Sequence, residues 1–140
     1  MTSDDVQFLM RIVLAGVLGY IVGLERKYVA HRDAGSSTYA LIALASALVT
    51  TLSQQIFDIA GASRLMANIV VGVGFIGGGT IVKQADHVHG LTTAAGIWAM
   101  ASVGMLVGSG RYGLGVAASV VVLVLFGAEY IEQRRDAAAK

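Results

Sequence analysis

The sequence lacks proline and cysteine, and it has few charged residues. Without cysteine, the 140-residue chain can form neither disulfide bonds nor thiolate metal sites. Without proline, its helices contain no residue that lacks a backbone N–H. Charged residues make up only 14% of the chain, whereas ordinary soluble domains have roughly 25%. The scarcity of charge therefore argues against a soluble globular domain.

The formal net charge of +1 shows no excess of basic residues. Proteins that bind nucleic acid need a basic stripe to neutralise phosphates, and this sequence has none. No Ser-His-Asp set or pair of carboxylates can be assembled around a plausible pocket, so we do not expect an enzyme. The sequence predicts no cofactor and no nucleic-acid partner, and the lipid bilayer is the first partner that its composition indicates.

Apolar residues make up 56% of the chain and gather in five stretches. Each is close to the roughly 20 residues that a membrane-spanning helix needs. The second is the weakest, because polar residues gather at its end, so it could be half-buried or tilted. Backbone polar groups must be satisfied inside lipid, which favours helices. We therefore predict an all-α, polytopic transmembrane helical bundle of about five spans in one domain, residues 1–140, with spans at 6–24, 38–56, 65–82, 91–109 and 112–131.

Basic residues near the span ends predict the orientation of the bundle. Asp4 and Asp5 replace the basic region of a secretory signal, and no small-residue cleavage site follows, so the first stretch is expected to be a retained span. We predict that the N-terminus lies outside and the C-terminus in the cytoplasm, with a short cytosolic tail at 132–140. This orientation places seven basic residues inside and three outside. The inside set is Arg26, Lys27, Arg32, Lys83, Arg134, Arg135 and Lys140, and the outside set is Arg11, Arg64 and Arg111.

Glycine is abundant, with 18 residues, and it recurs at helical spacing. Gly19 and Gly23 form one G-x-x-x-G pattern, and Gly104 and Gly108 form another. Such patterns indicate close packing of membrane helices. The neighbouring helix can belong to the same chain or to another, which leaves open a homodimer or other homo-oligomer.

The segment 72–79 is the richest in glycine. It matches the G-x-G-x-x-G dinucleotide pattern, but no strand precedes it and no acidic residue follows at the required distance. One interpretation is that Gly72, Gly74, Gly77 and Gly79 let helices pack closely. The other is that they interrupt the helix near mid-membrane, so that backbone groups line a polar path.

Charged and polar residues at the predicted membrane borders are further candidates. Glu25 directly precedes Arg26, either as an interfacial cap or as a carboxylate at the cytoplasmic mouth of a polar cavity. Glu129 lies in the last turns of the fifth span, where a charge usually faces protein or water. Arg64 and Asn68 share one face of the third helix, and the amide should make a structural hydrogen bond or contact a ligand.

The start of the fourth span supplies the remaining candidates. Thr92 and Thr93 can cap this helix or bond a carbonyl one turn earlier. Trp98, about two turns in, is expected to pack against another helix. His87 and His89 lack a third ligand and are expected to be surface histidines. No acidic residue lies near a predicted span centre, so no metal site is predicted, although Mg²⁺ stays open as a ligand or transported ion.

Several segments, taken in order, carry a family resemblance. They are residues 19–26, then 34–35 with Thr38, then Arg64 with 68–79, then 90–95 with Trp98, and finally Gly104 with 108–110. In this combination the chain resembles the MgtC/SapB family of bacterial membrane proteins over nearly its whole length. The resemblance places Glu25 and Arg26 on the family's acidic-basic pair. It places Arg64 on the arginine before the third span, and Thr92, Thr93 and Trp98 on the fourth-span motif.

The resemblance implies a multi-pass protein of the bacterial inner (plasma) membrane. The family is associated with growth under magnesium limitation and, in pathogens, with survival inside macrophages. Three departures are expected: Ser37 stands where a basic residue is usual, Asn68 stands where Gln is usual, and the chain is a short form without a C-terminal cytosolic domain.

Two functions follow from the residues and the resemblance together. The first is a non-enzymatic regulator, linked to magnesium homeostasis and to virulence, that acts through helix contacts with itself or with a membrane protein partner. The alternative is an oligomeric channel or transporter for Mg²⁺ or another cation, whose path is lined by the glycine-rich third helix.

Overall fold

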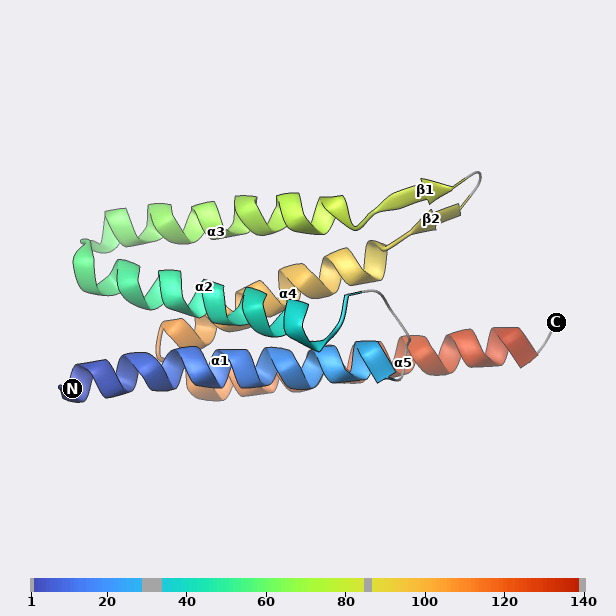
Figure 1. The fold of residues 1–140 in the computed structure, drawn as a ribbon, viewed down its shortest axis with the longest axis horizontal. Coiled ribbons are helices and arrows are strands. Elements are labelled where there is room, and N and C mark those ends of the chain that lie inside the picture. The colour runs from blue at the N-terminus through green and yellow to red at the C-terminus, as the bar shows by residue number, and fades with distance from the viewer. Residues whose placement is uncertain (1, 29–33, 85–86, 139–140) are drawn as a thin grey trace.

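The computed structural model describes residues 2–28, 34–84 and 87–138, and within them it contains five helices and one short hairpin (Figure 1). Each helix is long and apolar enough to cross a membrane, so the predicted five-span helical bundle is confirmed. The helices are α1 (Ser3–Tyr28), α2 (Ser36–Ile56), α3 (Ile59–Gly79), α4 (Leu91–Gly108) and α5 (Tyr112–Ala138). The strands are β1 (Val82–Gln84) and β2 (His87–His89).

The third helix begins before the apolar stretch that the sequence predicted as a span at 65–82. Asp58 caps α3, because its carboxylate accepts a hydrogen bond of 2.8 Å from the Gly61 N–H. The helix therefore runs from Ile59, ahead of the predicted span, and includes Gly61. Its end also differs, since Val82 belongs to β1. Asn68 consequently lies near the middle of α3.

The second helix, weakest in hydropathy, occupies the centre of the bundle. It packs against α1 on one side and α4 on another, and α3 lies along the outside of α2 and α4 (Figure 1). Half of α2 is buried, including Thr50, Thr51 and Ser53 near its end. Thr51 donates a 3.1 Å hydrogen bond to the Gly108 carbonyl. The polar end of α2 therefore faces protein, and its low hydropathy reflects burial among helices.

Glycines set the close approach of α1 to α2. A Cβ placed at Gly19 would lie 2.5 Å from the Tyr39 carbonyl oxygen, and one at Gly23 would collide with the Ser36 backbone. Because no side chain fits there, the two backbones can touch, as close packing of membrane helices requires. The first G-x-x-x-G pattern thus meets a helix of the same chain.

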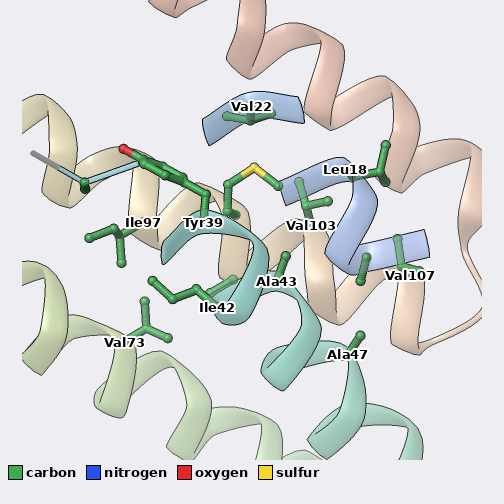
Figure 2. Packing of buried hydrophobic residues seen from close by; sticks show 14 of the residues in the cluster. Leu18, Val22, Tyr39, Ile42, Ala43, Ala47, Val73, Ile97, Val103 and Val107 are labelled. Carbon is green, nitrogen blue, oxygen red and sulfur yellow. The ribbon is translucent and has the colours of Figure 1, made fainter. Parts of the chain in front are cut away.

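The second G-x-x-x-G pattern joins α4 to α2 in the same way. A Cβ at Gly108 would lie 2.7 Å from the Ala47 carbonyl oxygen, and one at Gly104 would collide with the carbonyl oxygen of Ala43. Figure 2 shows the side chains between these helices, where Val103 and Val107 of α4 lie near Leu18 of α1. A continuous apolar core therefore fills the space between α1, α2 and α4.

A short antiparallel hairpin, which the sequence did not predict, connects α3 to α4. Val82 lies opposite His89, and Gln84 lies opposite His87. All of these residues are exposed, as expected for the two histidines. Gly90, with a φ of 85°, then turns the chain into α4 in the left-handed conformation that glycine adopts most readily.

The two chain ends lie at opposite ends of the bundle (Figure 1), as an odd number of crossings requires. The hairpin lies at the same end as the C-terminus. α5 continues through the segment predicted as a tail and ends at Ala138. Which end faces the cytoplasm stays a prediction from the distribution of basic residues.

Candidate functional site

A buried charged cluster joins α1 to α5 near the C-terminal end of the bundle. Arg26 is fully buried, and its Nη1 lies 3.0 Å from Oε2 of Glu129, to which it donates a hydrogen bond. The same nitrogen lies 3.8 Å from Oε2 of Glu25. The structure thus brings together three of the predicted candidates, and Glu129 faces protein as expected.

Two aromatic rings complete this cluster. The Arg26 guanidinium lies over the Phe126 ring, 4.0 Å from its centroid, in cation–π geometry. Tyr39 packs edge-on against Phe126, with centroids 6.3 Å apart and planes at 80°. Sequence reasoning missed both rings. Phe126 lies one turn before Glu129, a spacing that could have identified it, whereas Tyr39 gave no signal beyond its place beside Thr38.

Several polar atoms of the cluster are buried without a hydrogen-bond partner among the described residues. They are both carboxylate oxygens of Glu25, Nε and Nη2 of Arg26, and the hydroxyl of Tyr39. A buried charge is costly unless it is paired and hydrogen-bonded. The Arg26 charge therefore depends strongly on Glu129 and on the Phe126 ring.

The threonine candidates flank this end of the bundle without joining the charged cluster. Thr38 is partly buried in the first turn of α2, where its N–H bonds the Gly35 carbonyl. Thr93 is buried and Thr92 is partly buried, but neither caps α4. The cap residue is Gly90, which has no side chain to accept a hydrogen bond, so the predicted threonine cap is wrong.

A second candidate site is the outer face of α3, which consists of Arg64, Asn68, Val71, Gly72, Phe75 and Gly79. These residues recur every three or four positions and so share one side of the helix. All of them are exposed, whereas Ala62, Val73 and Gly77 lie buried on the opposite side. Within the described part of the chain, the Asn68 amide has no hydrogen-bond partner.

The glycines of α3 mostly point away from the rest of the chain. A Cβ at Gly72, Gly74, Gly78 or Gly79 would meet nothing within 4 Å. Among the glycines at 72–79, Gly77 alone approaches a neighbour, since a Cβ there would lie 3.4 Å from the Ala94 carbonyl oxygen of α4. The helix is also continuous through this segment. Close packing within the chain is thus correct for Gly77 alone, and the predicted helix break is wrong.

Trp98 is only partly covered by the rest of the chain. Its side chain on α4 is 49% exposed, while Ile97 beside it is fully buried. Within this chain, other helices therefore cover only about half of the indole, and packing against another helix stays a prediction. An exposed indole on a membrane helix has lipid or a partner as its surroundings.

Arg11 forms a polar site at the other end of the bundle, and sequence reasoning treated it only as a charge near a span end. Its Nη1 donates a 2.9 Å hydrogen bond to the Gly108 carbonyl, and its Nε lies 3.2 Å from the Tyr112 hydroxyl. It borders a recess of about 210 Å³ that is otherwise lined by Asp4, Gln7, Phe8, Thr51, Gln54 and Gln55. The sequence could have indicated this site, because Arg11 lies within a predicted span, where a charged side chain usually has a partner.

Metal ligands do not gather in the described residues. Among them, no group of three or more His, Cys, Asp and Glu side chains is placed to hold an ion. The carboxylates of Glu25 and Glu129 instead share the Arg26 guanidinium, at 3.8 Å and 3.0 Å from its Nη1.

Comparison with known proteins identifies the relatives of the chain. Residues 12–134 match the model of the MgtC family. YhiD of Escherichia coli (strain K12), whose name proposes magnesium transport, is 40% identical over 127 residues, covering 85% of this chain and 59% of YhiD.

Protein MgtC of Salmonella typhimurium (strain LT2) is 36% identical over 116 residues, covering 83% of this chain and 49% of that protein. The chain therefore spans between half and three fifths of the length of these relatives. No solved structure matches it. The five apolar helices and the family match together make it a multi-pass membrane protein. With the match extending over most of its length, the chain belongs to the MgtC family.

Proposed function

We propose that this chain is a non-enzymatic protein of the bacterial plasma membrane that binds and regulates a second membrane protein. The observation that carries this proposal is the position of Asn68. Its amide is exposed near the middle of α3, opposite the side that packs on the bundle. A polar group in hydrocarbon is costly unless it finds a partner. Helices that pack in membranes commonly supply one and approach through small residues.

The link to magnesium rests on the relatives. The name of YhiD proposes magnesium transport, and the MgtC family is associated with growth under magnesium limitation and with survival of pathogens inside macrophages. We therefore place the regulated partner in the magnesium response, with virulence as a consequence in a pathogen.

The alternative function is cation transport, which the name of YhiD favours. Within one chain, the space between α1, α2 and α4 is filled by the apolar core, and most α3 glycines face outward. A path lined by α3 would therefore need several copies of the chain. Reconstitution of the purified protein into liposomes tests this, with Mg²⁺ and monovalent cation flux compared between the wild type and Gly74→Leu. Flux that the variant loses would support transport, and no flux above empty liposomes would support regulation.

Growth at limiting magnesium tests the regulatory proposal. A strain that lacks the protein is complemented with the wild type, Asn68→Leu or Gly72→Leu. Both variants leave the bundle intact, because Asn68 is exposed and a Cβ at Gly72 meets nothing within 4 Å. We expect growth at the level of the empty vector despite unchanged membrane amounts. Val121→Leu, on the exposed side of α5, should complement fully. Full complementation by both α3 variants would contradict the proposal.

A further inference from the structure

Resting on the proposed function, we infer the chemistry of the partner: it is a transmembrane helix of another protein that carries a carboxylate level with Arg64. It also offers a hydrogen-bonding side chain to Asn68 and small residues to Phe75. The inference depends on the depth, charge and shape of the outer face of α3.

Depth excludes the lipid headgroups as the partner of Asn68. Asn68 is the tenth of the 21 residues of α3, which puts it about 14 Å along the helix at 1.5 Å per residue. Headgroups lie outside a hydrocarbon core about 30 Å thick. A group that hydrogen-bonds Asn68 at this depth must come from another membrane-embedded helix.

The positive charge of Arg64 calls for an acidic residue on the partner helix. Arg64 lies one turn before Asn68 on the same side of the helix, and within the described residues it forms no ion pair. A guanidinium stays charged in proteins and matches a carboxylate with two parallel hydrogen bonds. An Asp or Glu on the partner helix, one turn from the group that meets Asn68, satisfies both residues together.

The shape of the outer face around Phe75 calls for small residues farther along the partner helix. Phe75 is 86% exposed and is flanked by glycines at 72, 74, 78 and 79 that meet nothing within 4 Å. The ring therefore projects beyond the glycines around it. A partner with Gly, Ala or Ser opposite Phe75 can approach closely, as small residues permit between membrane helices.

An apolar groove beside the outer face gives the partner a further place to pack. It measures about 420 Å³ and lies between α2 and α3, where Leu41 and Val49 face Ile69, Gly72 and Ile76. Aliphatic side chains on the flank of a docked helix fit this groove.

A second copy of this chain fits the face less well. Copies inserted in the same orientation would bring two Arg64 residues to the same level of one interface. Like charges placed together in an interface repel each other and disfavour it. The charge on the face therefore favours a different, acidic protein.

Designed transmembrane peptides test this inference with the full chain in phosphatidylcholine vesicles. Both peptides are leucine-based helices with Ser at the centre and Gly one and two turns beyond it. One has Glu a turn before the Ser, and its matched control has Lys there. Energy transfer between labelled peptide and labelled protein measures association. We expect the Glu peptide to associate at least tenfold more tightly than the Lys peptide. Arg64→Glu should reverse the preference, which a misfolded variant would not do.

Three results would overturn the inference. Equal association of the two peptides means that charge does not select the partner. Self-association of the chain in peptide-free vesicles, lost in Asn68→Leu, assigns the face to a second copy. A preference that disappears when phosphatidylglycerol is added assigns Arg64 to lipid phosphates. After the first or the third result, failure of Asn68→Leu to support growth would still uphold the proposed function. The second result, self-association through Asn68, would overturn both proposals.

Discussion

At the scale of single residues, Arg26 shows how a charge is kept inside an apolar bundle. It is fully buried, and its guanidinium contacts two residues of α5, the Glu129 carboxylate and the Phe126 ring. The sequence indicated that Glu25, Arg26 and Glu129 matter, but it could not pair Arg26 with Glu129. They are 103 positions apart, and only the packing of α5 on α1 brings them together.

Removing the charge of Glu129 should destabilise the bundle. In Glu129→Gln, Arg26 loses its nearest countercharge while staying buried, and we expect the free energy of unfolding in detergent to fall by about 2 kcal/mol. Glu132→Gln, at an exposed position of the same helix, is the control and should change little. Adding Arg26→Met to Glu129→Gln should recover part of the loss, because the unpaired charge is then gone. Equal stability of Glu129→Gln and the wild type would refute this role.

Trp98 supplies a second residue-scale prediction, since it is the only tryptophan. Its 49% exposure predicts contact with acyl chains in liposomes of the purified protein. Its fluorescence should fall at least by half when brominated lipids replace ordinary ones. Unchanged emission would show that the indole is shielded, as the sequence had first indicated.

At the scale of elements, length and hydropathy were enough to predict five helices but not their places. Hydropathy measures affinity for lipid, so α2 looked weak although it is the central helix. Its threonines and serines are tolerated because neighbouring helices supply partners, such as the Gly108 carbonyl for Thr51. Glycine spacing predicted close packing correctly for α1 and α4. For α3 it could not tell which glycines face the bundle, because spacing carries no information about direction.

A matched pair of glycine substitutions tests this packing. Gly104→Ala should prevent normal folding, because the added methyl collides with the Ala43 carbonyl of α2. Gly127→Ala meets nothing within 4 Å and should stabilise α5 by about 0.5–1 kcal/mol through the lower entropy cost of alanine. Folded yield and unfolding in detergent measure both effects. Similar behaviour of the two variants would contradict the close approach of α4 to α2.

At the scale of the whole molecule, the ends of the chain lie at opposite ends of the bundle (Figure 1). The predicted excess of basic residues lies at the C-terminal end, where Lys27, Lys83 and Arg134 are exposed. The sequence predicted this asymmetry because the spans and their order were nearly correct. It missed the hairpin of β1 and β2, whose three-residue strands are too short to give a pattern.

The absence of native cysteine makes orientation directly measurable. Thr2→Cys should react with an impermeant maleimide on intact cells whose outer barrier has been opened. Ala138→Cys should react only after the plasma membrane is permeabilised. The reverse pattern would show that the basic end faces outward and that the orientation is wrong.

The central claim is that another membrane protein covers the outer face of α3, and photo-crosslinking in living cells tests it most directly. A photoreactive residue is placed at Gly72, or at Val121 on the exposed side of α5, in cells grown at limiting magnesium. We predict one discrete protein adduct from position 72, lost when Asn68→Leu is added, and only lipid adducts from position 121. Lipid adducts alone from position 72 would contradict the account.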